Sequence, residues 1–193
     1  MPAESAHLFS DEFCRYLREI SGEFQPEYRR LLKERKLHLM AAVTTNRTTP
    51  SLHFRDDLSW IRSDKSWRAP PLVPDLEKRW VEITGPASDR KLMINALNSG
   101  ADNFMADLED SASPHWIKGV VASHQNLYDA CRGTLTYEKK GEESKMYSIN
   151  ADPAALQFRP RGLHMYESHV IDESGRPMPA GLFDVATFIF HNS

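Results

Sequence analysis

Apolar positions recur with a helical period near the N-terminus. Four of them fall at i, i+3, i+4 and i+7 and share one helix face: Phe13, Tyr16, Leu17 and Ile20. Ser10, followed by two acidic residues, stands where a helix cap is expected. After Pro26, the segment EYRRLLKERKLHLM is amphipathic again and predicts a second helix. Residues 44–79 lose this periodicity and contain several prolines, which predicts an irregular, extended segment.

From Trp80 onward, short apolar stretches alternate with helical ones. The predicted strands are WVEITGP, NFMADLED and AALQFRPRGLHM. The predicted helices are RKLMINALNSG, which Ser88 and Asp89 cap and Gly100 ends, then SPHWIKGVVASHQNLYDACRG, and finally GLFDVATFIFHNS. A hairpin around a polar turn, TLTYEKKGEESKMYSIN, precedes the third strand. This order predicts an α/β fold with a parallel sheet.

Composition narrows the functional classes. The chain has 193 residues, of which 40% are hydrophobic and 26% charged, as in ordinary globular proteins. A formal net charge of −3 argues against a general nucleic-acid binder. No apolar run approaches the roughly 18 residues that cross a bilayer, and no signal peptide is evident, so we expect a cytoplasmic protein without a membrane partner. Cys14 and Cys131 match no metal-ligand spacing and are expected to be free thiols.

Three carboxylates follow the apolar part of the second predicted strand. Asp107 and Glu109 are two positions apart and are expected to share one face, whereas Asp110 points away or begins the loop. Carboxylates this close repel one another unless a cation lies between them. That cation is either a divalent metal or an arginine from a neighbouring strand.

Two arginines at the end of the third predicted strand are the available partners. Arg159 and Arg161 flank Pro160 and are expected to share a strand face. Because chemistry in parallel sheets gathers at the carboxyl ends of the strands, we expect an arginine to meet the carboxylates there. Two interpretations stay open from the residues alone: a site for Mg²⁺ and an oxygen-rich substrate, or a structural ion-pair network.

Four blocks, in order, resemble segments of the A-type malate synthases. They are VEITGPASDRKLMINALNSGADNFMADLEDSASPHW, NLYDACRGTLTY, FRPRGLHMYESHV and GRPMPAGLFDVATFIFHN. The resemblance implies that residues 79–193 are the N-terminal part of a (β/α)₈ TIM barrel, with about three strands and incomplete at its C-terminus. Residues 1–78 would be the helical N-terminal clasp and an irregular linker.

The resemblance also implies an activity and roles for individual residues. The family condenses acetyl-CoA with glyoxylate in the presence of Mg²⁺ and hydrolyses the product to malate and CoA. Arg159 would be the catalytic arginine. Asp107 and Glu109 would line the metal site, Glu109 through a metal-bound water, and Ser111 would lie near acetyl-CoA. Arg161 would line the substrate site or only support Arg159.

The family's direct magnesium ligands and its aspartate base have no counterpart in these 193 residues. We therefore expect the 193-residue chain alone to be inactive and to self-associate through the unclosed barrel edge. Two alternatives remain: a CoA-thioester lyase related to the citrate-lyase β subunit or malyl-CoA lyase, and a non-catalytic fragment. A peroxisomal or glyoxysomal location is the alternative to the cytoplasm.

Overall fold

A computed structural model describes most of the chain. The described residues are 3–44, 54–141 and 144–193. The chain divides into two compact units, one formed by residues 24–73 and the other by residues 1–23 together with 74–193. Residues 45–53 of the predicted irregular segment lie outside the described residues. The first unit contains the distal part of a long helix and two short elements, η2 (Asp56–Leu58) and α2 (Ser59–Ser63).

The N-terminal segment is helical, as predicted. A 3₁₀ helix, η1 (Ala3–Phe9), leads into α1 (Asp11–Thr44), and the Phe13 N–H donates to Ser10 Oγ at 3.1 Å, which confirms the predicted cap. Phe13 and Leu17 of the predicted apolar stripe are buried, and Tyr16 and Ile20 are partly buried. These residues pack in a cluster with four side chains from later elements: Val120, Met178, Phe183 and Ala186.

The prediction of two helices separated at Pro26 is wrong, because α1 runs through Pro26 without a break. Proline removes one N–H and ordinarily ends or kinks a helix. Here side-chain bonds along the helix support the turns around it. Arg29 Nη1 donates to Gln25 Oε1 at 2.8 Å, and Arg30 Nε donates to Glu27 Oε2 at 2.6 Å.

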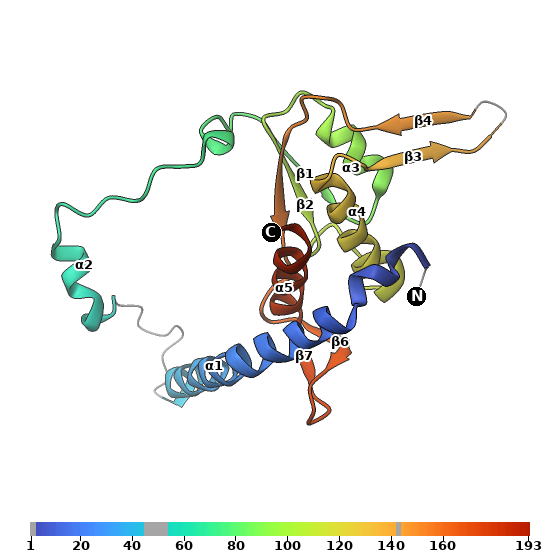
Figure 1. Cartoon of the computed structure of the whole chain (residues 1–193). Helices are drawn as coiled ribbons and strands as arrows, with labels where there is room; N and C mark the ends of the chain where they lie inside the picture. The colour runs from blue at the N-terminus through green and yellow to red at the C-terminus, as the bar shows by residue number, and fades with distance from the viewer. Residues whose placement is uncertain (1–2, 45–53, 142–143) are drawn as a thin grey trace. The chain divides into compact units, whose positions relative to one another are not determined.

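A three-stranded parallel sheet confirms the α/β class. Its strands are β1 (Glu82–Pro86), β2 (Asn103–Asp107) and β5 (Ala155–Arg159), in the order β1-β2-β5 (Figure 1). α3 (Arg90–Leu97) connects β1 to β2. The register pairs Pro86 with Asp107 and Asp107 with Arg159, so the last residues of the three strands lie in one row.

One face of the sheet carries the apolar core. Phe104 and Ala106 of β2 are buried there against helical residues. These residues come from α3 and from α4 (Ala122–Cys131): Met93, Ile94, Leu97 and Leu127. Alternation along β2 therefore directs Asp107 to the opposite face from Phe104 and Ala106.

The helix before α4 begins differently from the prediction. Residues Trp116–Val121 form a π-helical turn, η4, in which the Gly119 and Val120 N–H groups both donate to the His115 carbonyl. A Cβ at Gly119 would lie 1.9 Å from the Ser113 carbonyl oxygen. Only glycine allows this close approach of the chain to itself.

The hairpin prediction is confirmed by β3 (Thr136–Lys139) and β4 (Lys145–Ser148), which project from the sheet (Figure 1). A second antiparallel pair, β6 (Tyr166–Ile171) and β7 (Pro177–Pro179), was not predicted. Its turn contains Gly175 at φ +77, a conformation that favours glycine. The expected terminal helix follows as α5 (Ala180–Asn192).

Removing the α3 cap provides a test of this local structure. The Asp89 side chain accepts the Leu92 N–H at 2.9 Å. We expect Asp89→Ala to lower the free energy of unfolding by about 1 kcal/mol, measured by urea denaturation. Asp152→Ala, at an exposed position outside any helix, is the control and should change it little. Equal effects of the two substitutions would show that the cap contributes nothing.

Candidate functional site

Arg159, the last residue of β5, lies among three carboxylates, one at the end of β2 and two directly after it. Its Nη2 donates to Glu109 Oε2 at 2.7 Å and to Asp110 Oδ2 at 2.6 Å, and its Nη1 lies 3.5 Å from Asp107 Oδ2. The arginine therefore meets the carboxylates at the carboxyl edge of the parallel sheet. All three acidic residues of the run participate, including Asp110 from the loop.

Asp107 organises the turn that brings the other carboxylates to Arg159. Its side chain is 1% exposed and accepts the Glu109 N–H at 2.8 Å and the Ser111 N–H at 3.1 Å. The Ser111 hydroxyl donates to the same carboxylate at 3.0 Å. These bonds bend the chain directly after Asp107, so β2 ends there and Glu109 is not a strand residue.

The same contacts set the charge states. Burial by itself raises the pKa of Asp107, but hydrogen bonds from Glu109 and Ser111 and the charge of Arg159 outweigh it and lower the pKa. Asp110 is the largest contributor to the raised pKa of Arg159. Asp107 is thus held as a carboxylate and Arg159 as a guanidinium.

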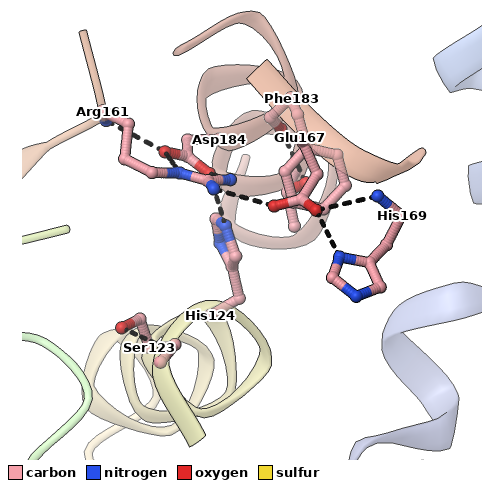
Figure 2. Close-up of polar contacts among 9 residues, drawn as sticks. Ser123, His124, Arg161, Glu167, His169, Phe183 and Asp184 are labelled. Carbon is pink, nitrogen blue, oxygen red and sulfur yellow. Dashed lines mark hydrogen bonds and ion pairs between the residues drawn. The ribbon is translucent and has the colours of Figure 1, made fainter. Parts of the chain in front are cut away.

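Arg161 does not lie beside Arg159 on a shared strand face, as the sequence suggested. β5 ends at Arg159, and Pro160 offers no N–H to continue the ladder. The Arg161 side chain instead enters a buried network, shown in Figure 2. Its Nη1 donates to Glu167 Oε2 at 2.7 Å, and its Nη2 donates to Asp184 Oδ1 at 2.8 Å.

Two histidines contact the carboxylates of this network, of which His124 is buried and His169 is exposed. His124 Nε2 lies 3.2 Å from Asp184 Oδ1, and His169 Nδ1 lies 2.8 Å from Glu167 Oε1 (Figure 2). The His169 ring also stacks on Trp116 at a centroid distance of 4.8 Å. Burial lowers the pKa of Arg161, but the bonds and charges of Asp184 and Glu167 outweigh it and raise the pKa. Burial raises the pKa of Asp184, and hydrogen bonds from His124 and Arg161 reverse this effect and lower it.

Sequence reasoning did not single out Asp184, Glu167 or His124. A signal for Asp184 was present, because it is the one charged residue in the apolar segment GLFDVATFIF. A carboxylate in such a helix is buried only with a partner. Its partner, Arg161, is 23 residues away, and no local pattern specifies that pairing.

The carboxylates around Arg159 could in principle bind a metal ion. Carboxylate oxygens are ligands that Mg²⁺ favours. Within the described parts of the chain, however, no group of three His, Cys, Asp or Glu side chains is arranged to hold an ion. Asp107, Glu109 and Asp110 converge on Arg159 instead, so these residues do not fit a direct magnesium-ligand set.

Comparisons with known proteins identify relatives over nearly the whole chain. The chain is 40% identical over 188 residues to the malate synthase of Myxococcus xanthus, covering 97% of this chain and 33% of that protein. It is 39% identical over 189 residues to malate synthase A of Escherichia coli, covering 98% of this chain and 34% of that protein. This chain is a homologue of the malate synthases. No protein-family model matches it.

The malate synthase relatives are longer than this chain. The chain spans about a third of the length of the two bacterial enzymes and 18% of the bifunctional glyoxylate cycle protein of Caenorhabditis elegans, to which it is 39% identical. This coverage is consistent with an N-terminal portion of a malate synthase. None of the helices in the described parts of the chain has the length and apolar character of a membrane-spanning segment.

The lowered pKa of Asp107 predicts a pH-dependent contribution to stability. The ionised Asp107 carboxylate stabilises the fold at pH values above 3.8, which is the pKa of the free side chain. This stabilisation is lost as the pH falls through the lower pKa of Asp107 in the folded state. We expect Asp107→Asn to lower the free energy of unfolding at neutral pH by about 1–3 kcal/mol, because a buried acceptor of three hydrogen bonds is changed.

The difference in free energy of unfolding between Asp107→Asn and the wild type should become smaller as the pH falls from about 7 to about 3, measured by urea denaturation at each pH. Asp152→Asn, at an exposed position, is the control. A difference that stays constant across this range would contradict the charged, hydrogen-bonded state of Asp107.

Proposed function

We propose that this chain carries part of a malate synthase active site. The reaction would be condensation of acetyl-CoA with glyoxylate, followed by hydrolysis of the malyl-CoA to malate and CoA. The observation that supports this most directly is the position of Arg159, whose guanidinium meets three carboxylates at the carboxyl edge of the parallel sheet. In sheets of this kind, that edge is where active sites form.

Arg159 would act on oxygen atoms that gain negative charge. A base removes a proton from the acetyl methyl group, and the resulting enolate carbon attacks the aldehyde carbon of glyoxylate. Negative charge then moves from the enolate oxygen to the former aldehyde oxygen. A guanidinium fixed beside these atoms stabilises both, and its carboxylate partners hold it in one orientation. The base itself would come from outside these 193 residues.

The local charge supports a requirement for another cation. Three carboxylates face one guanidinium, so the edge carries an excess of negative charge that would repel the glyoxylate carboxylate. We propose that Mg²⁺ supplies the compensation, with direct ligands from outside these 193 residues. Glu109 and Asp107 would line its site, Glu109 through a metal-bound water. Arg161 supports Arg159 in this proposal and does not itself contact substrate.

The remaining assignments are part of the same proposal. The three parallel strands would be the first strands of a TIM barrel, in residues 79–193, and residues 1–78 would be the helical clasp and linker. Ser111, whose hydroxyl donates to Asp107, would lie near acetyl-CoA. A cytoplasmic or glyoxysomal location would suit the reaction; the relative from Candida tropicalis is named as glyoxysomal.

A chimera tests the proposed function. The present chain replaces the segment of the Escherichia coli enzyme to which it is 39% identical over 189 residues. CoA release from acetyl-CoA and glyoxylate is followed with a thiol reagent, and we expect the chimera to be active. Arg159→Lys keeps one positive charge but loses the paired donors, so we expect a loss of about 10²–10³-fold in kcat.

Arg176→Lys is the matched control for the chimera. Arg176 is exposed, binds Asp172 in the β6–β7 turn, and should tolerate lysine without loss of activity. A chimera that is folded but inert, or one whose Arg159→Lys variant keeps full activity, would count against the proposal. Cleavage of malyl-CoA without hydrolysis would indicate the related lyase reaction.

The 193-residue chain alone provides a separate test. We expect no CoA release above the rate without protein, because the proposed base and metal ligands are not among its residues. In the described sheet, the outer edge of β5 has no strand partner, so we also expect the apparent mass to rise with concentration in light scattering. A monomer at all concentrations with measurable turnover would contradict both expectations.

A further inference from the structure

Arg161 is held at both its main chain and its side chain by one residue of α5. The Asp184 carboxylate accepts the Arg161 main-chain N–H at 2.9 Å, its Nε at 2.9 Å and its Nη2 at 2.8 Å. Asp184 is fully buried, and Arg161 is 4% exposed. Three donors of one residue on one buried carboxylate leave that residue little freedom of position.

α5 also contacts the other side of the Arg161 peptide. A Cβ added at Gly181 would lie 2.6 Å from the Arg161 carbonyl oxygen, so the helix backbone lies directly against it. The N–H and the carbonyl of Arg161 are therefore both bounded by α5, two residues after Arg159.

The next residue, Gly162, lies against the carboxylates of the candidate site. A Cβ at Gly162 would lie 2.5 Å from Glu109 Oε1 and 2.5 Å from the His164 ring. Glu109 is one of the residues that bind the Arg159 guanidinium. The segment of residues 160–162 is thus bounded by α5 on one side and by the Arg159 site on the other.

We propose that Asp184 is a positioning residue, which fixes the guanidinium of Arg159 through Arg161 and the segment of residues 160–162. Its importance for catalysis rests on the proposed function of Arg159. Glu167 differs from Asp184 in one respect, because among the Arg161 donors it binds only the Nη1 group. Glu167 therefore compensates buried charge, whereas Asp184 also holds the main chain that leads to Arg159.

This difference provides a matched pair of variants. Asp184→Asn and Glu167→Gln each remove one carboxylate charge from the same buried guanidinium, and both should lower stability. The readout is the ¹⁵N spectrum of the Arg159 guanidinium in the 193-residue chain, assigned by its loss in Arg159→Lys. Because Nη1 and Nη2 have different partners, hindered rotation about the Nε–Cζ bond should give two separate signals.

We expect Asp184→Asn to accelerate exchange between the two Nη signals by about tenfold. This is the change in rate that corresponds to the loss of one charge-assisted hydrogen bond. Glu167→Gln should leave the exchange rate as in the wild type. Unchanged exchange in folded Asp184→Asn, or equal acceleration in both variants, would overturn the proposal. If Asp184→Asn does not fold, Gly181→Ala decides, because its Cβ displaces the Arg161 carbonyl while every charge remains.

Gly181→Ala should likewise accelerate the exchange, and an unchanged rate in that variant would overturn the proposal. The measurement involves no turnover. An unchanged spectrum would therefore contradict the positioning role of Asp184 without contradicting the proposed function. A folded but inert chimera would contradict the proposed function, and the coupling between Asp184 and Arg159 would still be tested by the exchange measurement.

Discussion

The pairing of Asp107 with Arg159 is the constraint on which the rest of the site depends. The two residues are register partners at the ends of neighbouring parallel strands, and the Arg159 carbonyl accepts the N–H of Leu108 at 3.1 Å. A carboxylate as deeply buried as Asp107 requires compensation by donors and positive charge. Its hydrogen bonds bend the chain after β2, and that bend brings Glu109 and Asp110 to the same guanidinium.

Two arginines separated by one proline have opposite surroundings. Arg159 is partly exposed at the sheet edge, where its carboxylate partners include one that solvent reaches freely. Arg161 is enclosed and bound by two buried carboxylates. The exposed arginine is accessible to a ligand, and the enclosed one is committed to the fold. Pro160 separates the two surroundings because it ends the strand ladder at Arg159.

Local patterns predicted the elements that are stabilised locally. The caps at Ser10 and Asp89, the strand–helix alternation and the hairpin of β3 and β4 all follow from neighbouring residues. The helix runs on through Pro26, with side-chain pairs on the neighbouring turns, although a proline there predicts a break. The meeting of Arg159 with the carboxylates could be anticipated because parallel strands align their ends.

The buried network could not be predicted from such patterns. Asp184 and Arg161 are 23 residues apart, and His124 reaches Asp184 across 60 residues. These three residues come from α4, α5 and the segment between β5 and β6, so only tertiary packing brings them together. The lone acidic residue in an apolar helix indicated that a partner existed but not which one.

The separation of the site residues along the chain affects the order of folding. Arg159 follows Asp107 by 52 residues, and a helix and a hairpin lie between them. Closing a loop of this length opposes folding entropically before any favourable contact forms. The bend at Asp107 needs only residues up to Ser111 and can form early during synthesis. The ionic cluster itself can form only after synthesis has reached Arg159 and this residue has paired beside β2.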